Sequence, residues 1–183
     1  MTRTEPHLRQ ADVGDAAALL DIYRPYVQAP AHCFELVVPT EEDFAQRIAQ
    51  ARTRWDWWLA EAAGEVLGYA YAGAHRARAA YRYSCEVSVY LAPAAQGRGI
   101  GSALYGRLLP SLAELGYFNA LAVIVQPNPR SLAFHARQGF RPVGVFERAG
   151  YKQGRWWDVA WLQKRLREGE PRAEPGILDP PRP

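Results

Sequence analysis

The chain has 183 residues, of which 49% are hydrophobic, 12% aromatic and 22% charged, which is the composition of an ordinary globular protein. This length allows one domain with a sizeable core and leaves too little chain for two. The formal net charge is only +3, and its arginines are scattered along the sequence, so we expect no nucleic-acid partner. No apolar run reaches membrane-spanning length, so we expect no membrane association.

The chain contains two cysteines, Cys33 and Cys85, which lie far apart in the sequence. They form no CxxC motif and no His/Cys cluster with the spacing of metal ligands, so we expect no metal site. Isolated thiols are typical of reducing compartments, which predicts a cytoplasmic protein.

Hydrophobic periodicity predicts a short strand that ends near Arg9, followed by a turn over residues 12–15 and an amphipathic helix. Ala17, Leu20 and Tyr23 or the adjacent Arg24 follow the helical spacing, so we expect them on one face of this helix.

A second helix begins after Thr40, which forms a capping box with Asp43. Two strands then meet at Ala63-Gly64, a pair typical of a hairpin turn. The next strand alternates, so its two faces carry different residues. Cys85, Val87, Val89 and Leu91 face one side, and Glu86, Ser88 and Tyr90 face the other.

A glycine-rich turn over 96–101 opens a long helix in which we expect Pro110 to introduce a kink. A buried strand, a short helix ended by Gly139 and two closing strands complete the order βααβββαβαββ. This order predicts an α/β fold of the α+β type with a mixed, largely antiparallel sheet. Residues 1–166 form the single predicted domain, and the charged, proline-rich segment 167–183 is predicted to be a flexible tail.

The turn after the alternating strand contains Gly97, Gly99 and Gly101 and directly precedes a helix. Free backbone N–H groups and the partial positive charge of a helix N-terminus favour an anion at such a turn, and Arg98 adds a full charge. No Lys-Ser/Thr pair follows, which excludes a P-loop, and the glycine spacing does not fit the dinucleotide-binding motif. A plain tight turn at a helix start is the alternative.

The segment from Gln96 to Gly101, after the strand VSVYL, resembles the Q/R-x-x-G-x-G/A pyrophosphate loop of the GNAT N-acetyltransferases. The resemblance covers residues 7–166 and is greatest to the phosphinothricin and methionine-sulfoximine acetyltransferases, through residues 68–91, 122–140 and 149–163. It implies a GNAT fold, with a central twisted sheet whose strands splay apart and helices on both faces. It also implies acetyl-CoA as co-substrate and a homodimer.

The resemblance further implies two catalytic residues. Glu86 matches the general base of the family, and His135 is implied as an acid, a second base or an orienting residue. The backbone N–H of Val89 is implied to polarise the acetyl carbonyl. The implied cofactor contacts are Val89, Tyr90, Leu91, Gly97, Arg98, Gly99, Ile100, Gly101, Ser102, Asn128 and Arg137. The alternatives are a solvated or salt-bridged Glu86, a His135 that only packs near the cofactor, and an Asn128 that caps a helix.

The acceptor is implied to be a small molecule that resembles an amino acid. Arg76 and Arg78 match the substrate loop of this branch, and an arginine fork suits an α-carboxylate. The implied acceptor contacts are Phe34, Arg76, Ala77, Arg78, Glu86, Val87 and Ser88. We therefore predict transfer of an acetyl group to the α-amino group of such an acceptor. The alternatives are acetylation of a protein N-terminus or another amine, such as a polyamine, and a non-catalytic acyl-CoA-binding module.

Overall fold

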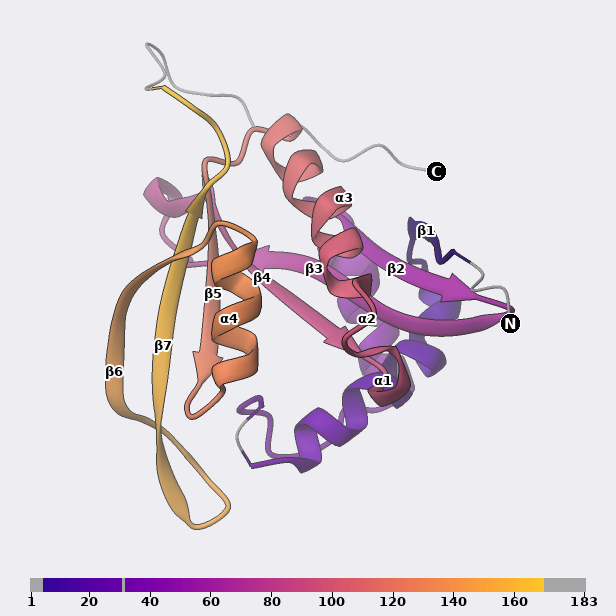
Figure 1. Cartoon of the computed structure of the whole chain (residues 1–183), viewed down its shortest axis with the longest axis horizontal. Helices are drawn as coiled ribbons and strands as arrows, with labels where there is room; N and C mark the ends of the chain where they lie inside the picture. Colours follow the sequence, from indigo (N-terminus) through magenta and orange to yellow (C-terminus); the bar gives the residue numbers. More distant parts are fainter. Residues whose placement is uncertain (1–4, 31, 170–183) are drawn as a thin grey trace.

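The computed structural model describes residues 5–30 and 32–169 (Figure 1). The elements follow one another in the predicted order, and three short 3-10 turns lie between them. The strands are β1 (His7–Gln10), β2 (Trp57–Ala62), β3 (Glu65–Ala74), β4 (Ser84–Leu91), β5 (Asn119–Val125), β6 (Arg141–Lys152) and β7 (Arg155–Arg165). The helices are α1 (Ala16–Gln28), α2 (Glu41–Ala51), α3 (Ile100–Glu114) and α4 (Pro129–Arg137), and the 3-10 turns are η1 (Val13–Asp15), η2 (Ala79–Tyr81) and η3 (Pro93–Ala95).

The strands form one sheet in the order β1-β2-β3-β4-β5-β7-β6. All neighbouring pairs are antiparallel except β4 and β5, which run parallel. These two strands pair only between residues 84–86 and 119–121, after which they separate. In Figure 1, β5, β7 and β6 accordingly lie on one side of the molecule and β1, β2 and β3 on the other. The predicted mixed sheet with splayed strands is confirmed.

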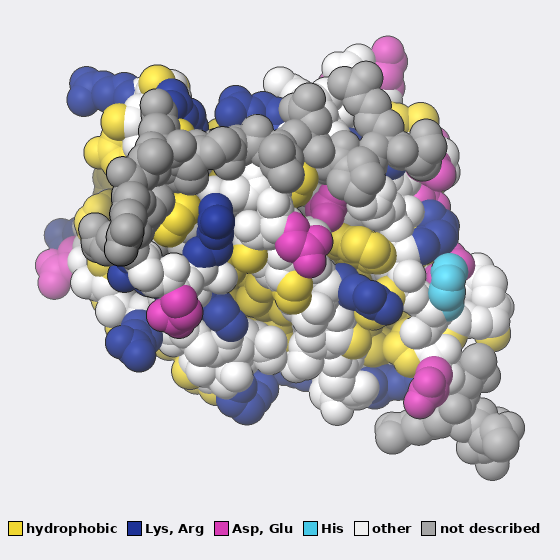
Figure 2. Space-filling view, turned by 90° about the horizontal axis from the view of Figure 1, so that it is seen from above, with side chains coloured by type: hydrophobic (Ala, Val, Ile, Leu, Met, Phe, Trp, Pro, Cys, Tyr) yellow, Lys and Arg dark blue, Asp and Glu magenta, His cyan; other side chains and the backbone are white. Residues whose placement is uncertain are grey.

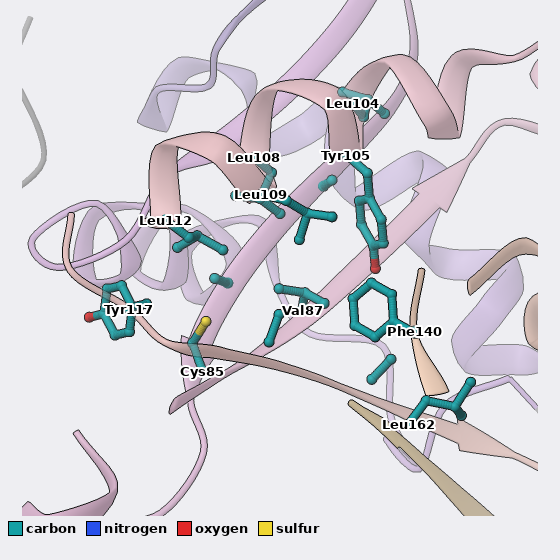
Figure 3. Packing of buried hydrophobic residues seen from close by; sticks show 14 of the residues in the cluster. Cys85, Val87, Leu104, Tyr105, Leu108, Leu109, Leu112, Tyr117, Phe140 and Leu162 are labelled. Atoms are coloured by element: carbon teal, nitrogen blue, oxygen red, sulfur yellow. The ribbon is translucent and has the colours of Figure 1, made fainter. Parts of the chain in front are cut away.

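Helices cover both faces of the sheet, as predicted. On one face, α3 buries Leu104, Leu108 and Leu112 against Cys85 and Val87 of β4 (Figure 3). On the other face, α1 and α2 pack over the β1–β4 half of the sheet and form a second core. That core contains Leu19, Tyr23, Phe44, Ile48, Trp57, Leu59 and Tyr69. The predicted alternation along β4 is confirmed, because Tyr90 packs against this second core while Val89 and Leu91 pack against the first.

The buried face of α1 differs from the prediction. Ala17 and Arg24 are exposed, and the buried stripe starts instead at Ala16. It continues through Leu19, Leu20, Tyr23 and Val27, which is the i, i+3, i+4 spacing of one helix face. These positions form the face of α1 that packs against α2 and the sheet in the second core, which Ala17 and Arg24 do not join.

Most local turn and cap predictions are confirmed. Thr40 and Asp43 form the capping box of α2, and Ala63 and Gly64 turn the β2–β3 hairpin with φ values of 53° and 81°. Gly139, with φ of 85°, ends α4 in the left-handed conformation that glycine adopts without strain. α3 continues through Pro110 to Glu114.

The predicted tail lies largely outside the described residues, since only 167–169 of it are described. Within that short part, the Arg167 guanidinium lies 4.9 Å from the centre of the Phe118 ring. Among the helices of the described residues, none is long and apolar enough to cross a membrane.

Candidate active site

A cavity of about 460 Å³ lies where β4 and β5 separate. Its walls are residues 87–91 of β4 and 122–125 of β5, and α4 contributes Arg130, Ser131, Phe134, His135 and Arg137. The turn before α3 and its first residues complete the lining with Gln96, Gly97, Gly99, Ile100, Gly101 and Ser102. We refer to this cavity as the cleft.

The sheet topology explains why two helix N-termini meet at the cleft. The carboxyl ends of parallel β4 and β5 lie at the same edge of the sheet, and each strand leads into a helix, α3 or α4. The N-cap of α3 is Gly99, which has no side chain to cap the helix. The first N–H groups of a helix have no partner within it, so those of residues 100–102 are available to an anion. Gly97 and Gly99 have φ values of 75° and 81°, a left-handed backbone conformation that glycine adopts without strain, which explains why glycine occupies both positions.

The predicted cofactor residues converge on this cleft. All of them line it except Arg98, which is exposed in the turn and lies outside the lining. Asn128 also caps α4, because its Oδ1 accepts a hydrogen bond of 3.1 Å from the N–H of Ser131. The helix-cap interpretation of Asn128 is therefore confirmed, and its position in the lining is compatible with a cofactor contact.

Several cleft residues were not among the predicted site residues, among them Tyr26, His32, Arg130 and the β5 segment 122–125. The Tyr26 hydroxyl donates to the carbonyl of Leu91 at 2.7 Å and accepts from the Leu91 N–H and the Gln96 amide. The side-chain oxygen of Gln96 accepts a hydrogen bond of 2.6 Å from the guanidinium of Arg130. Tyr26 gives no signal in the sequence, whereas Arg130 lies in the first turn of a helix that follows a parallel strand.

The N–H of Val89 points toward the space between β4 and β5, where the two strands separate. The N–H of Ala92 bonds to Leu67 of β3, and the N–H of Leu91 bonds on the opposite side to Tyr26. Successive N–H groups of a strand alternate between its two edges, and the β3–β4 register has no irregularity through Val89. Val89 therefore directs its N–H away from β3, in the same sense as Leu91.

His135 lines the cleft but is only 4% exposed. Its Nδ1 donates to the carbonyl of Ser131 at 2.9 Å, which leaves Nε2 to accept from the Tyr105 hydroxyl at 3.0 Å. Burial lowers the pKa of the imidazole below its ordinary 6.5. Both ring nitrogens therefore have partners, and the geometry favours a neutral, packed histidine.

Glu86 lies at the last residue pair before the strands part, opposite Leu121 of β5. Its side chain is directed away from the α3 face and is 35% exposed. Its Oε1 lies 2.9 Å from Nδ1 of His75. Glu86 does not itself line the cleft, but the next two residues, Val87 and Ser88, do.

The remaining predicted acceptor residues are dispersed. Arg76, Ala77 and Arg78 lie in an exposed segment between β3 and η2, with the Arg76 guanidinium 6.0 Å from the centre of the Trp161 ring. Phe34 packs directly on Gly150 of β6, where a Cβ would come within 2.3 Å of its ring. None of these four residues lines the cleft, so the structure does not gather them into one pocket with Val87 and Ser88.

Lys152 fixes the segment that carries Phe34. This lysine is 3% exposed, and its ammonium donates to the carbonyls of Val27, Ala29 and Cys33 at 2.6, 3.0 and 2.9 Å. The three bonds use all three N–H donors of the ammonium. They join the end of β6 to the last turn of α1 and to the chain that follows it, and so hold Phe34 beside Gly150.

The fold and the cleft place unpaired backbone donors of a helix N-terminus between two separated strands, with the Glu86 carboxylate at the point where the strands separate. Within the described residues, no group of three His, Cys, Asp or Glu side chains is placed to hold a metal ion. The comparison with known families agrees with this arrangement. The model of the acetyltransferase (GNAT) domain matches residues 8–161, and the chain belongs to this family.

Individual relatives refine the branch. The chain is 39% identical over 166 residues to a phosphinothricin N-acetyltransferase of Streptomyces coelicolor, covering 88% of this chain and 97% of the relative. It is 33% identical over 162 residues to an L-methionine sulfoximine/L-methionine sulfone acetyltransferase of Salmonella typhimurium, and the match covers 88% of this chain and 95% of the relative.

Among solved structures, a GNAT superfamily phosphinothricin acetyltransferase from Sinorhizobium meliloti in complex with AcCoA matches with a TM-score of 0.88. The sequences are 36% identical, and the match covers 95% of this chain and 96% of the other. The predicted family, branch, fold and enzyme class are confirmed.

Proposed function

We propose that the chain transfers the acetyl group of acetyl-CoA to the α-amino group of a small, amino-acid-like acceptor, with Glu86 as general base. One observation carries the proposal: the cleft of unpaired backbone donors and the Glu86 carboxylate meet where β4 and β5 part. The named activities of the relatives, on phosphinothricin and on methionine sulfoximine, support the acceptor class.

The residues of the cleft fit acetyl-CoA, which supplies the activated thioester. Its phosphates suit the free N–H groups at the start of α3 and the exposed side chains of Arg98, Arg130 and Arg137 around the cleft. The N–H of Val89 is available to the acetyl carbonyl oxygen, on which negative charge develops during attack.

Glu86 removes the proton that keeps the acceptor unreactive. An amine with a pKa of about 10 is only about 0.1% free base at neutral pH, so attack requires a proton acceptor. The Glu86 carboxylate takes this proton directly or through one water, and the amine nitrogen bonds to the acetyl carbon. The carbon–sulfur bond then breaks, and the second proton lost by the nitrogen passes through solvent to the departing thiolate, which leaves as the thiol.

We propose that His135 acts as an orienting residue and not as a proton donor. Its bonds to Tyr105 and Ser131 join α4 to α3, and these are the two helices whose N-termini form the cleft. A proton transfer through His135 would require one of these bonds to break.

Arg76 and Arg78 remain our proposed ligands for the acceptor carboxylate. They are exposed and border the segment that leads to Glu86, so either guanidinium is free to reach an acceptor bound beside β4. A polyamine would instead be repelled by these two positive charges.

We propose that two copies of the chain associate through β6. This strand ends the sheet order, so one of its edges has no neighbouring strand among the described residues. Val143, Val145 and Phe146 on β6 are 62%, 55% and 56% exposed, so this edge strand presents large apolar side chains to solvent. Size-exclusion chromatography with light scattering should give twice the chain mass for the wild type and the chain mass for Phe146→Asp.

A cytoplasmic location also remains a proposal. It is supported by Cys33 and Cys85, which are both free and buried. Cell fractionation with an antibody to the native protein would test it.

A thiol-release assay with acetyl-CoA and a panel of acceptors tests the function. The panel contains phosphinothricin, methionine sulfoximine, ordinary amino acids, a polyamine and a short peptide. We expect turnover with amino-acid-like acceptors and its near loss in Glu86→Gln. Turnover confined to the peptide or the polyamine would refute the acceptor class. Binding of acetyl-CoA without turnover of any acceptor would favour a binding module.

A further inference from the structure

Among the described residues, His75 is the side chain in hydrogen-bond contact with the proposed base. It directly follows the last residue of β3, and its Nδ1 lies 2.9 Å from Oε1 of Glu86. In the antiparallel β3–β4 register, Gly73 lies opposite Glu86 and Ala74 opposite Cys85. The register therefore places His75, the first residue after β3, on the same face of the sheet as Glu86.

Two aromatic rings hold the imidazole of His75 in place. The ring of Tyr81, from η2, and the ring of Trp161, from β7, each lie 5.6 Å from it in edge-on orientation. The side chain is only 13% exposed, whereas that of Glu86 is 35% exposed. His75 is thus the fixed member of the pair, and Glu86 is the member that solvent and an acceptor can reach.

A second His–Glu contact in the same sheet lacks these features and provides a comparison. His7 of β1 lies 3.2 Å from Glu61 of β2, but its side chain is 70% exposed. No aromatic ring of the described residues is in ring contact with it. The His75 contact is therefore not the ordinary state of a histidine next to a glutamate on this sheet.

The chemistry of the two groups fixes the direction of the bond. An ionised carboxylate only accepts hydrogen bonds, so Nδ1 of His75 carries the hydrogen and donates to Oε1. The structure shows no partner for Oε2 within residues 5–30 and 32–169. One oxygen is thereby committed to His75, and the other is left for the acceptor.

We propose that His75 is a positioning residue that holds the Glu86 carboxylate so that Oε2 receives the proton of the acceptor amine. This inference rests on the proposed function, in which Glu86 is the base. A base held in one orientation transfers protons faster than a freely rotating one, because a misplacement of about 1 Å can cost about 100-fold in rate.

Three variants separate the hydrogen bond from the packing of the ring. His75→Phe keeps an aromatic ring between Tyr81 and Trp161 but removes the donor. His75→Asn keeps a donor near the position of Nδ1 but removes the basic imidazole. His7→Phe is the matched control, because it removes the comparable contact to Glu61 at the far edge of the sheet.

Steady-state kinetics with the best acceptor of the panel gives the main test. We expect His75→Phe to lower kcat between about 10-fold and 100-fold with the KM for acetyl-CoA unchanged. His75→Asn should retain most of kcat, and His7→Phe should match the wild type. Combined with Glu86→Gln, His75→Phe should cause no further loss, because both changes disable the same group.

Other outcomes would overturn the inference in different ways. A wild-type kcat in His75→Phe would show that the hydrogen bond does not matter, even if Glu86→Gln is slow and the proposed function stands. A kcat in His75→Asn as low as in His75→Phe would assign the role to the imidazole itself. A wild-type rate in Glu86→Gln would refute the proposed base, and with it the positioning role.

A spectroscopic measurement tests the contact without turnover. In ¹H–¹⁵N spectra of neutral imidazoles, we expect His75 of the wild type to carry its hydrogen on Nδ1. An Nε2–H tautomer of His75 in the folded wild type would contradict the proposed bond.

Discussion

The two sides of β4 are built in different ways. On the cofactor side, the backbone donors for an anion come from one short segment, the turn before α3 and its first residues, although β4, β5 and α4 also line the cleft. On the acceptor side, Glu86 depends on His75 from the end of β3, and Phe34 depends on Gly150 and Lys152 from β6. The anion-binding donors of the cofactor side are therefore formed locally, whereas the acceptor side is assembled from several strands.

This difference has a chemical reason. Phosphate and thioester groups are recognised by backbone N–H groups, which a short turn and a helix start supply together. An acceptor amine must be deprotonated at one point in space, which requires side chains fixed from several strands. Substitutions on the two sides should therefore have separable kinetic effects.

The largest effect is expected at the point where the two sides meet. Glu86→Gln removes the proton acceptor and preserves the shape of the side chain, so kcat should fall by about 10²- to 10⁴-fold. The affinity for acetyl-CoA should not change, because Glu86 does not line the cleft. Stopped-flow or steady-state kinetics with both substrates varied will show whether the two effects separate.

A stability effect is expected where the acceptor side is held together. Lys152→Met leaves the carbonyls of Val27, Ala29 and Cys33 without their donor, so unfolding should become easier by about 3 kcal/mol. Lys164→Met is the control, since among the described residues one carbonyl, that of Gln138, accepts from Lys164. Urea unfolding measures both variants. Equal losses of stability would contradict the special role of Lys152.

A binding effect is expected on the cofactor side alone. Arg130→Ala removes a cation at the cleft that now bonds to Gln96, so the KM for acetyl-CoA should rise about 10-fold, as expected for an interaction of about 1.4 kcal/mol. kcat at saturating acetyl-CoA should stay near the wild-type value. Arg107→Ala, on the exposed face of α3 and outside the cleft, should change neither constant.

The smallest effect is a pH dependence of stability from His135. Because burial lowers the pKa of His135, the unfolded chain binds a proton before the folded chain does as the pH falls below 6.5. The free energy of unfolding should therefore fall in acid, with a slope from this group of at most about 1.4 kcal/mol per pH unit. His135→Asn should flatten the curve between pH 7 and 5 in urea titrations. An unchanged slope would show that His135 is not buried in neutral form.

The residues that the sequence predicted for the cofactor converge on the cleft, whereas those predicted for the acceptor lie dispersed and their roles remain predictions. The positions of Gly97 and Gly99, just before a helix, indicate their role in the sequence, because a left-handed turn before a helix favours glycine at such positions. His75 gives no such signal, since its meaning depends on the β3–β4 register and on Trp161, more than eighty residues later in the chain. Tyr26 was missed for the same reason: its bonds to Leu91 and Gln96 join segments that only the fold brings together.

The central claim is that acetyl-CoA binds in the cleft, separately from the base. Calorimetric titration of acetyl-CoA into the wild type, Gly99→Val and Glu86→Gln tests it most directly, with thermal melts to confirm that each variant is folded. Valine at position 99 is strained at a φ of 81° and adds a side chain at the start of α3. We predict one binding site per chain in the wild type and in Glu86→Gln, and strongly weakened binding in Gly99→Val. Unimpaired binding in folded Gly99→Val, or its loss in Glu86→Gln, would contradict the account.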